Sequence, residues 1–325
     1  MNRRSLLAAT AGLLAAPAIH AQGTGVWPQP GRTVRVIVPW PPGAANDALG
    51  RLLAQQITEK LGGTAVVENR TGGSGLVGTT AVLQASPDGY TLLASAFNTA
   101  VMPLVLKGAT FDPETDFEVL ARTAKAPLVM VISGSRPEKT LAEVIAAAKA
   151  NPKDWTIAIS SLGSAGHLAT IEFNRRTGAG LEMAPYRGTQ PALTDIMAGN
   201  VQLLIDPSFA LLPATRDGRV RALGIAAAQR SALAPDLPTM AEGGLRGFEF
   251  QSWYGVWAPK GTPREIQLKV NTLMQDTMRD PEIAARLTSQ VLEPVTESIA
   301  ETRAFIASEI VRAKDLLRSV NFEPV

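Results

Sequence analysis

Short apolar runs rich in β-branched residues alternate with longer stretches whose apolar positions recur at helical spacing along most of this 325-residue chain. Several of the short runs are apolar throughout, which is typical of strands buried on both faces of a sheet. The alternation predicts parallel sheets covered by helices on both faces. The predicted strands are 34–38, 64–68, 90–95, 129–133, 156–160, 181–186, 201–206 and 222–227. The predicted helices between them are 47–61, 76–85, 141–150, 167–177, 192–198 and 208–217.

The pattern changes after Pro238, where glycines interrupt the chain and residues 251–258 are aromatic and extended. Two long helices are predicted beyond them, at 263–278 and 298–320. These helices cannot form a domain alone, so we expect them to pack on the first part of the chain. The length of the chain also favours two domains. We therefore predict a lobe 1 made of residues 22–126 and 228–325, and an inserted lobe 2 made of residues 127–227, with crossovers near 127–133 and 222–228.

The first 21 residues have the features of a secretory leader. Arg3 and Arg4 precede an uncharged run, 5–16, which is too short to span a bilayer. Small residues follow, and we predict cleavage after Ala21, with Ala18 as the alternative. The paired arginines before Ser-Leu-Leu fit either a twin-arginine signal or an ordinary leader. The mature chain is therefore expected in the periplasm.

Charge and composition exclude several classes of function. Loss of Arg3 and Arg4 reduces 31 basic residues to 29, equal to the 29 acidic ones, so the mature chain is formally neutral. Neither this balance nor any basic run favours a nucleic acid partner. Without cysteine, the chain has no disulfides, thiolate metal sites or cysteine nucleophiles. His20 is lost with the leader and only His167 remains, so we expect no cofactor and no metal site.

The loop after the first predicted strand is a candidate binding site, because ligands of α/β proteins bind beyond the carboxyl ends of strands. Prolines stiffen residues 39–47, and small residues let a ligand approach the main chain. A helix that begins at Asn46 or Asp47 offers unpaired amides to an anion. The alternative is that either residue simply caps the helix. The candidates here are Trp40, Pro42, Gly43, Ala44, Asn46 and Asp47.

A second loop, 161–167, follows the predicted strand 156–160 in the same way. Its small residues and hydroxyls suit a second carboxylate oxygen or a bridging water, and the alternative is a serine cap with turn glycines. At other strand ends, Arg187 is either a partner for a distal carboxylate or a solvated rim residue. Asp206 either contacts the ligand or caps the next helix. The candidates in this group are Asn98, Ser161, Ser164, Ala165, Gly166, His167, Arg187 and Asp206.

Two patterns that resemble enzyme motifs are weaker evidence of function than the two loops. Residues 73–78 have the glycine spacing of a dinucleotide-binding turn, but four residues separate them from the preceding strand and no acidic residue ends the next strand. A serine hydrolase would use His167 as its base, yet the chain has no G-x-S-x-G elbow and no evident third orienting group. We therefore favour capture without catalysis, with a hydrolase centred on Ser164 and His167 as the alternative.

Several short stretches, in their order and spacing, resemble a known family nearly from end to end. They are 36–43 with Asp47 and Arg51, 68–70 with the glycine turn after it, 87–93, 111–113 with 116–117, the loop ending in His167, 185–188, 192–195, 237–239 with Glu242, 252–255, 258–259 and 261–263. The sequence resembles the Bug family of periplasmic receptors, which are the substrate-binding proteins of tripartite tricarboxylate transporters.

This resemblance implies a type II-like periplasmic binding protein fold, in which two α/β lobes close on a ligand in the cleft between them. It also implies that main-chain amides of 42–47 and 161–167 hold one ligand carboxylate, with the help of ordered water. Ala44 stands where the family usually has a second glycine, and Trp40 where phenylalanine is common, so a relative's ligand does not transfer directly.

We therefore expect a monomeric, non-enzymatic receptor that captures a small carboxylate, either a di- or tricarboxylate or an aromatic acid. It would deliver this ligand to a membrane transporter of the tripartite tricarboxylate type. A receptor that presents its ligand to a membrane kinase is a further alternative.

Overall fold

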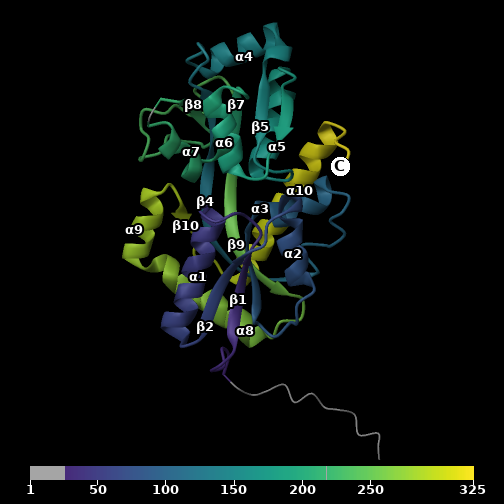
Figure 1. Ribbon diagram of the computed structural model, residues 1–325, viewed down its shortest axis with the longest axis vertical. Coiled ribbons are helices and arrows are strands. Elements are labelled where there is room, and N and C mark those ends of the chain that lie inside the picture. The colour runs from purple at the N-terminus through teal and green to yellow at the C-terminus, as the bar shows by residue number, and fades with distance from the viewer. Residues whose placement is uncertain (1–25, 217) are drawn as a thin grey trace, which may run out of the picture.

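The computed structural model describes residues 26–216 and 218–325, and Figure 1 shows them as two α/β lobes along the long axis. The predicted leader, 1–21, and the last residue of the predicted helix 208–217 lie outside these ranges. None of the helices within them combines the length and apolarity that a membrane span requires. The strands are β1 (Thr33–Val38), β2 (Thr64–Asn69), β3 (Thr91–Ala96), β4 (Phe117–Ser133), β5 (Thr156–Ile159), β6 (Glu182–Pro185), β7 (Leu203–Pro207), β8 (Val220–Ile225), β9 (Gln251–Pro259) and β10 (Glu293–Pro294). The helices are α1 (Ala45–Leu61), α2 (Leu76–Leu83), α3 (Phe97–Val105), α4 (Leu141–Ala150), α5 (Ala165–Thr177), α6 (Thr189–Ala198), α7 (Ser208–Ala214), α8 (Arg264–Arg279), α9 (Pro281–Ser289) and α10 (Ile299–Ser319).

A ten-stranded sheet runs through both lobes in the order β2-β1-β3-β9-β4-β7-β5-β6, with β8 and β10 also paired to β4. β1 is parallel to β2 and β3, and β5 is parallel to β6 and β7. However, β9 is antiparallel to β3 and β4, and β4 is antiparallel to β7 and β8. The predicted parallel pairing is thus found within each lobe, but the sheet as a whole is mixed. β4 leads from lobe 1 to lobe 2 and β9 leads back, so these neighbours run in opposite directions.

β4 is the strand that the two lobes share (Figure 1). Its first part, from Phe117 to Pro127, pairs with β9, and its second part, from Leu128 to Ser133, pairs with both β7 and β8. The sequence pattern predicted only residues 129–133 as a strand here, because charged residues interrupt the apolar run of the first part. The partners of β4 thus change near the expected crossover, while the lobe boundaries themselves stay a prediction.

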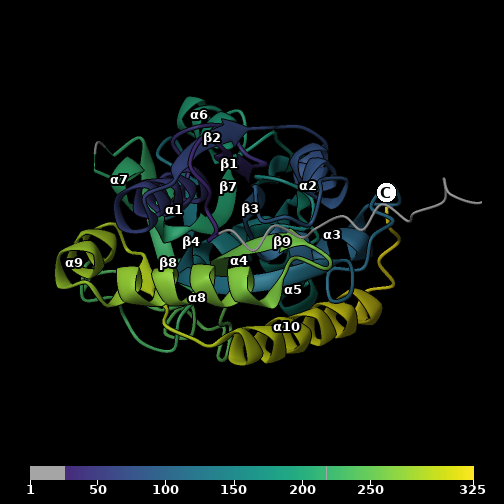
Figure 2. The same ribbon diagram turned by 90° about the horizontal axis from the view of Figure 1, so that it is seen from below.

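Helices cover both faces of the lobe 1 sheet because its central strands are apolar on both faces. Val36 belongs to a buried cluster with Leu53 of α1 and Val270 of α8, whereas Ile37 belongs to another cluster with Val101 of α3. Successive strand residues point to opposite faces, which explains this division. Figure 2 shows α1 and α2 on opposite sides of β1 and β3. This packing fixes the carboxyl ends of β1 and β3, from which the first candidate loop starts.

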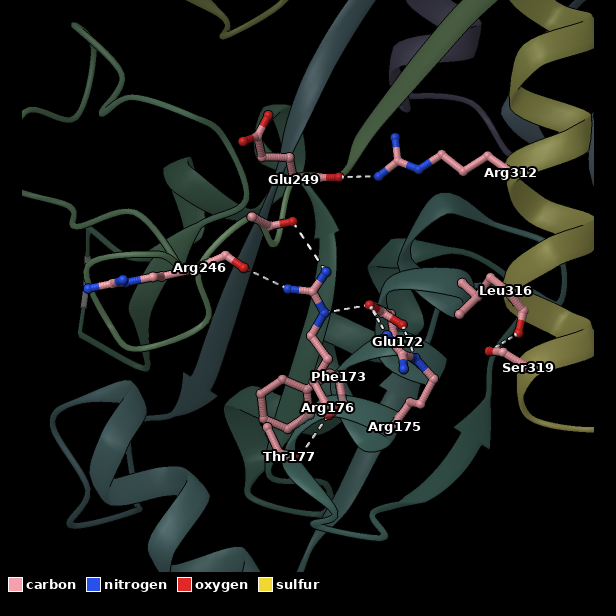
Figure 3. Close-up of polar contacts among 11 residues, drawn as sticks. Glu172, Phe173, Arg175, Arg176, Thr177, Arg246, Glu249, Arg312, Leu316 and Ser319 are labelled. Carbon is pink, nitrogen blue, oxygen red and sulfur yellow. Dashed lines mark hydrogen bonds and ion pairs between the residues drawn. The ribbon is translucent and has the colours of Figure 1, made fainter.

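An arginine from each lobe holds the segment that leads into β9. Arg176 of α5 donates to the two carbonyls of residues 246–247, at 2.8 and 3.3 Å. Arg312 of α10 donates to the carbonyl of Glu249 at 2.6 Å. Glu172 in turn accepts from Arg176, as Figure 3 shows. Main-chain carbonyls at the return to lobe 1 are thus satisfied by side chains of both lobes.

The two helices that the sequence pattern missed have local explanations. The apolar residues of α3 continue directly from those of β3, and Pro103 lies inside the helix, so no separate helical period is visible. In α9, by contrast, Asp280 caps the helix and Pro281 occupies its first position. Both are start signals that the sequence does carry. The predicted helix 141–150 coincides with α4.

Gly255 in β9 has no room for a side chain, because a Cβ there would lie 2.8 Å from the carbonyl oxygen of Ala121 in β4. We expect Gly255→Ala to lower the free energy of unfolding by about 1–3 kcal/mol through overpacking. Gly108→Ala is the matched control, since its Cβ would lie 3.6 Å from Leu76, an ordinary contact. Urea unfolding measures both variants, and equal stabilities would contradict this account of the strand pair.

Candidate functional site

A cavity of ≈ 600 Å³ lies between the lobes and is lined by both. This volume lies in the range that small-molecule sites occupy. Lobe 1 contributes the loop after β1 and the starts of α1 and α3. Lobe 2 contributes the ends of β5 and β7 and the starts of α5, α6 and α7, and β9 adds two residues. The lining residues are Trp40–Asn46, Ala96, Asn98, Ser160, Ser161, Ser164, Ala165, Gly188, Thr189, Gln190, Pro191, Asp206, Pro207, Phe209, Ala210, Pro213, Ser252 and Tyr254.

Four helices of eight or more residues begin at this cavity, namely α1, α3, α5 and α6. The first N–H groups of a helix have no partner within it and carry partial positive charge. The N-cap residues of α1, α3 and α6 are Ala44, Ala96 and Gly188, whose side chains cannot accept a hydrogen bond. The fourth, α5, is capped by Ser164. Of the helices that begin elsewhere, α4, α9 and α10 have side-chain caps and α2 and α8 have none. The cavity therefore presents uncapped helix amides to its occupant.

Asp47 holds the loop between β1 and α1 from behind. Its carboxylate accepts from Gly43 N at 3.1 Å, from Asn69 Nδ2 at 3.0 Å and from Arg51 Nε at 2.9 Å. Burial raises the pKa of Asp47, but these hydrogen bonds outweigh burial and hold the pKa below its usual value. Asp47 does not line the cavity. Its contribution is to fix the loop whose amides do.

Trp40 and Asn46 are bonded to each other in the cavity wall. The donors and acceptors around the Asn46 amide assign its oxygen to face Trp40 Nε1 and its nitrogen to face Ser95 O, each at 3.2 Å. Gly75 leaves room for the large ring, because a Cβ at that position would lie 3.0 Å from Trp40. The indole is thus held in one orientation.

The second candidate loop, 161–167, is bonded across the cleft to lobe 1. Asn98 Nδ2 of α3 donates to Ser161 Oγ at 3.0 Å, and both side chains are buried. Within lobe 2 the loop lies directly on β7. A Cβ on Gly166 would lie 2.1 Å from the carbonyl oxygen of Ile205, so only glycine fits there. Gly166 therefore sets the position of α5 without lining the cavity itself.

His167 is buried behind this loop, 1% exposed, and does not line the cavity. Its Nδ1 accepts from Gly163 N at 3.1 Å, and its main-chain N donates at 3.0 Å to Ser164 Oγ, which caps α5. The ring packs edge-on against Phe322. Burial lowers the pKa of His167 to about 4, so the imidazole is neutral near pH 7. Among the described residues no hydrogen bond joins this imidazole to a serine hydroxyl, so no Ser–His dyad is formed.

Asp206 is the one acidic side chain among the described residues that line the cavity, and none of them is basic. It is 1% exposed and accepts from Ser160 Oγ at 2.9 Å and from Thr189 Oγ1. Burial raises the pKa of Asp206 to about 6. Arg187, which was considered as a partner for a distal carboxylate, is exposed and lies outside the lining.

The structure brings ten of the fourteen predicted site residues together around the cavity. Three others, Asp47, Gly166 and His167, support the loops from behind, and Arg187 is exposed. Sequence reasoning missed the apolar wall, such as Phe209, because an apolar residue after a strand resembles any core residue. Its position directly after the end of a strand was the available signal. The ten are Trp40, Pro42, Gly43, Ala44, Asn46, Asn98, Ser161, Ser164, Ala165 and Asp206.

A smaller cavity of ≈ 360 Å³ lies between α5 and α10. Two of its arginines, Arg175 and Arg176, are both paired with Glu172 (Figure 3). Arg175 and Arg176 are thus already satisfied by a carboxylate of their own helix. Over residues 26–216 and 218–325, no group of three or more His, Asp or Glu side chains is arranged to hold a metal ion.

Two α/β lobes that share the long strand β4 and enclose a cavity at their helix N-termini define a solute-binding protein of the periplasmic, type II-like class. Residues 49–322 match the model of the TctC family, the tripartite tricarboxylate transporter family receptors, and the chain belongs to this family. Protein BugT of Bordetella pertussis (strain Tohama I) is 36% identical over 324 residues, which cover 98% of each chain. The predicted resemblance to the Bug family is thereby confirmed.

Two solved structures are similar over most of their length. Rpa4515 of R. palustris, solved with adipate, is 32% identical with a TM-score of 0.87, and the match covers 91% of this chain and 99% of that one. MatC (Rpa3494) from Rhodopseudomonas palustris, solved with bound malate, is 31% identical with a TM-score of 0.83, and the match covers 89% and 100%. These similarities confirm the predicted fold class.

The burial of His167 predicts a pH dependence of stability. Because its pKa is near 4 in the folded chain and about 6.5 when unfolded, the unfolded state binds more protons between these values. The contribution of His167 to the free energy of unfolding is therefore fully present above pH 6.5, and it falls by about 3 kcal/mol as the pH drops to 4. His167→Asn keeps an acceptor for Gly163 N, and urea unfolding from pH 7.5 to 4 should show a shallower loss. Parallel curves for the two proteins would contradict the assignment.

Proposed function

We propose that the chain is a periplasmic receptor that captures a small carboxylate in the interlobe cavity, leaves it chemically unchanged and delivers it to a membrane transporter of the tripartite tricarboxylate type. The observation that carries this proposal is the convergence of uncapped helix N-termini on a cavity without basic side chains among its described residues. Such amides bind anions without a cationic side chain. The predicted leader, 1–21, supports export of the chain.

One ligand carboxylate would be held by amides at the starts of α1 and α5. Ala45 is the first helical residue of α1 and lines the cavity, and its N–H has no partner within the helix. On the other side, Ser164 and Ala165 line the cavity at the start of α5. The adipate and malate in the similar structures of Rpa4515 and MatC support a carboxylate as the ligand class.

Binding would favour the closed arrangement of the lobes, because only a ligand that contacts both lobes shifts the equilibrium toward closure. The lobes already meet at two places beside the cavity. One is the hydrogen bond from Asn98 to Ser161. At the other, a Cβ on Gly188 of lobe 2 would lie 4.0 Å from the ring of Pro41 of lobe 1. A ligand between these contacts would touch both lobes at once.

Capture without catalysis is supported by the state of His167. Its imidazole is neutral, accepts from the main chain and faces away from the cavity lining. A general base must lie within hydrogen-bond reach of the proton that it removes, and among the described residues the imidazole of His167 has no hydrogen bond to a hydroxyl that lines the cavity. The hydrolase centred on Ser164 and His167 is therefore the weaker hypothesis.

A thermal-shift panel tests the ligand class. At about 100 times its Kd, a bound ligand adds about 2.7 kcal/mol to the free energy of unfolding, which raises Tm by several degrees. We expect mono- and dicarboxylates to include such ligands and neutral sugars to give no shift. Recovery of the bound acid with unchanged mass would support capture. A shift with sugars and with no carboxylate would refute the proposal.

Removal of a single amide tests how the carboxylate is held. Proline is tolerated at the first position of a helix, and Ala44 before it has an extended conformation that accepts a following proline. We expect Ala45→Pro to weaken carboxylate binding by about 10- to 100-fold, the range for a hydrogen bond to a charged group. Ala45→Val adds similar bulk and keeps the N–H, so it is the control. Equal losses in the two variants, measured by calorimetry, would show that bulk and not the amide is responsible.

A further inference from the structure

The charged groups around the cavity discriminate between one ligand carboxylate and two. Amides at the starts of α1 and α5 are assigned to the first ligand carboxylate, and the uncapped amides of α3 and α6 are the remaining main-chain donors. None of the described lining residues is Lys, Arg or His, so a second carboxylate has no cationic partner. It would instead share the cavity with Asp206. Both oxygens of this carboxylate already accept from the hydroxyls of Ser160 and Thr189, which leaves their protons unavailable to a ligand.

The uncharged part of the wall is rich in rings. Trp40, Phe209 and Tyr254 line the cavity together with several prolines. Trp40 is held by the hydrogen bond to Asn46, and the absence of a side chain at Gly75 leaves space for the indole. An aromatic surface fixed in this way prefers a flat ring as its partner, since offset or edge-on ring contacts add to the gain from burial.

We propose that the preferred ligand is an aromatic monocarboxylate, whose single carboxylate meets the helix amides while its uncharged ring lies against Trp40 and the apolar wall. This inference rests on the proposed function and narrows its ligand class. Asp206 acts in it as a specificity-determining residue that disfavours a second ligand carboxylate. The structure thus assigns this chain a ligand different in class from the adipate and malate of the two similar structures.

Isothermal titration of the mature protein with three probes tests the inference. Benzoate carries one carboxylate and a flat ring, cyclohexanecarboxylate has the same charge and a puckered ring, and adipate carries two carboxylates. We expect benzoate to bind at least about tenfold more tightly than adipate, the effect of one unmatched like charge in a partly desolvated site. Cyclohexanecarboxylate should bind about 3- to 10-fold more weakly than benzoate, the range of ring–ring contacts.

Three variants assign the preference to residues. Asp206→Asn should tighten adipate binding about tenfold relative to benzoate binding, so that the preference for benzoate falls by that factor. Trp40→Leu should weaken benzoate binding about 3- to 10-fold, with Trp40→Phe close to the parent protein. Thermal unfolding of each variant checks that it is folded, and the ranking of the three probes on the unaltered protein does not depend on any variant.

The outcomes separate this inference from the proposed function. Adipate binding as tightly as benzoate, or more tightly, would overturn the monocarboxylate assignment and leave carboxylate capture intact. Equal affinities for benzoate and cyclohexanecarboxylate would overturn the role of the aromatic wall. Binding of none of the three acids, together with binding of a neutral ligand, would overturn the proposed function itself.

Discussion

The start of an α-helix leaves main-chain N–H groups without partners, and the rest of this molecule depends on where those groups lie. Away from the cavity, α4, α9 and α10 satisfy some of them with side-chain caps, whereas α2 and α8 have no such cap. At the cavity, α1, α3 and α6 have Ala44, Ala96 and Gly188 in the cap position. Amides in such a place require water or a ligand as their partner. An anion is the partner that also matches the helix dipoles.

The fold brings those helix starts together from two lobes. β4 runs through both lobes and β9 returns beside it, with Gly255 permitting their close approach. Gly166 lets α5 lie directly on β7, and Asp47 secures the loop before α1. Charged residues such as Asp47 therefore act behind the site. The cavity itself offers amides, hydroxyls and rings, and Asp206 is the one described charge that lines it.

The sequence predicted the parts of this arrangement that depend on local patterns. Apolar runs located most strands, and the small residues after β1 and β5 located both loops. The antiparallel course of β4 and β9 was not predictable, because strand direction depends on which lobe the chain enters next. Local sequence patterns also could not predict where His167 and Arg187 lie relative to the cavity. A histidine near a serine-rich loop has the same sequence signal whether it faces the ligand or, as here, the core. Phe209 and Tyr254 of the aromatic wall were missed for the same reason, whereas Trp40 was predicted as part of the first loop.

The central claim is that neutral main-chain donors hold the ligand's carboxylate. A crystal structure of the mature protein with a bound carboxylate, at a resolution that orders its oxygens, tests this most directly. The account predicts that both oxygens accept from N–H groups at the starts of α1 and α5, directly or through one water, with no basic side chain in contact. A carboxylate paired with Arg187 or with another arginine or lysine would contradict it.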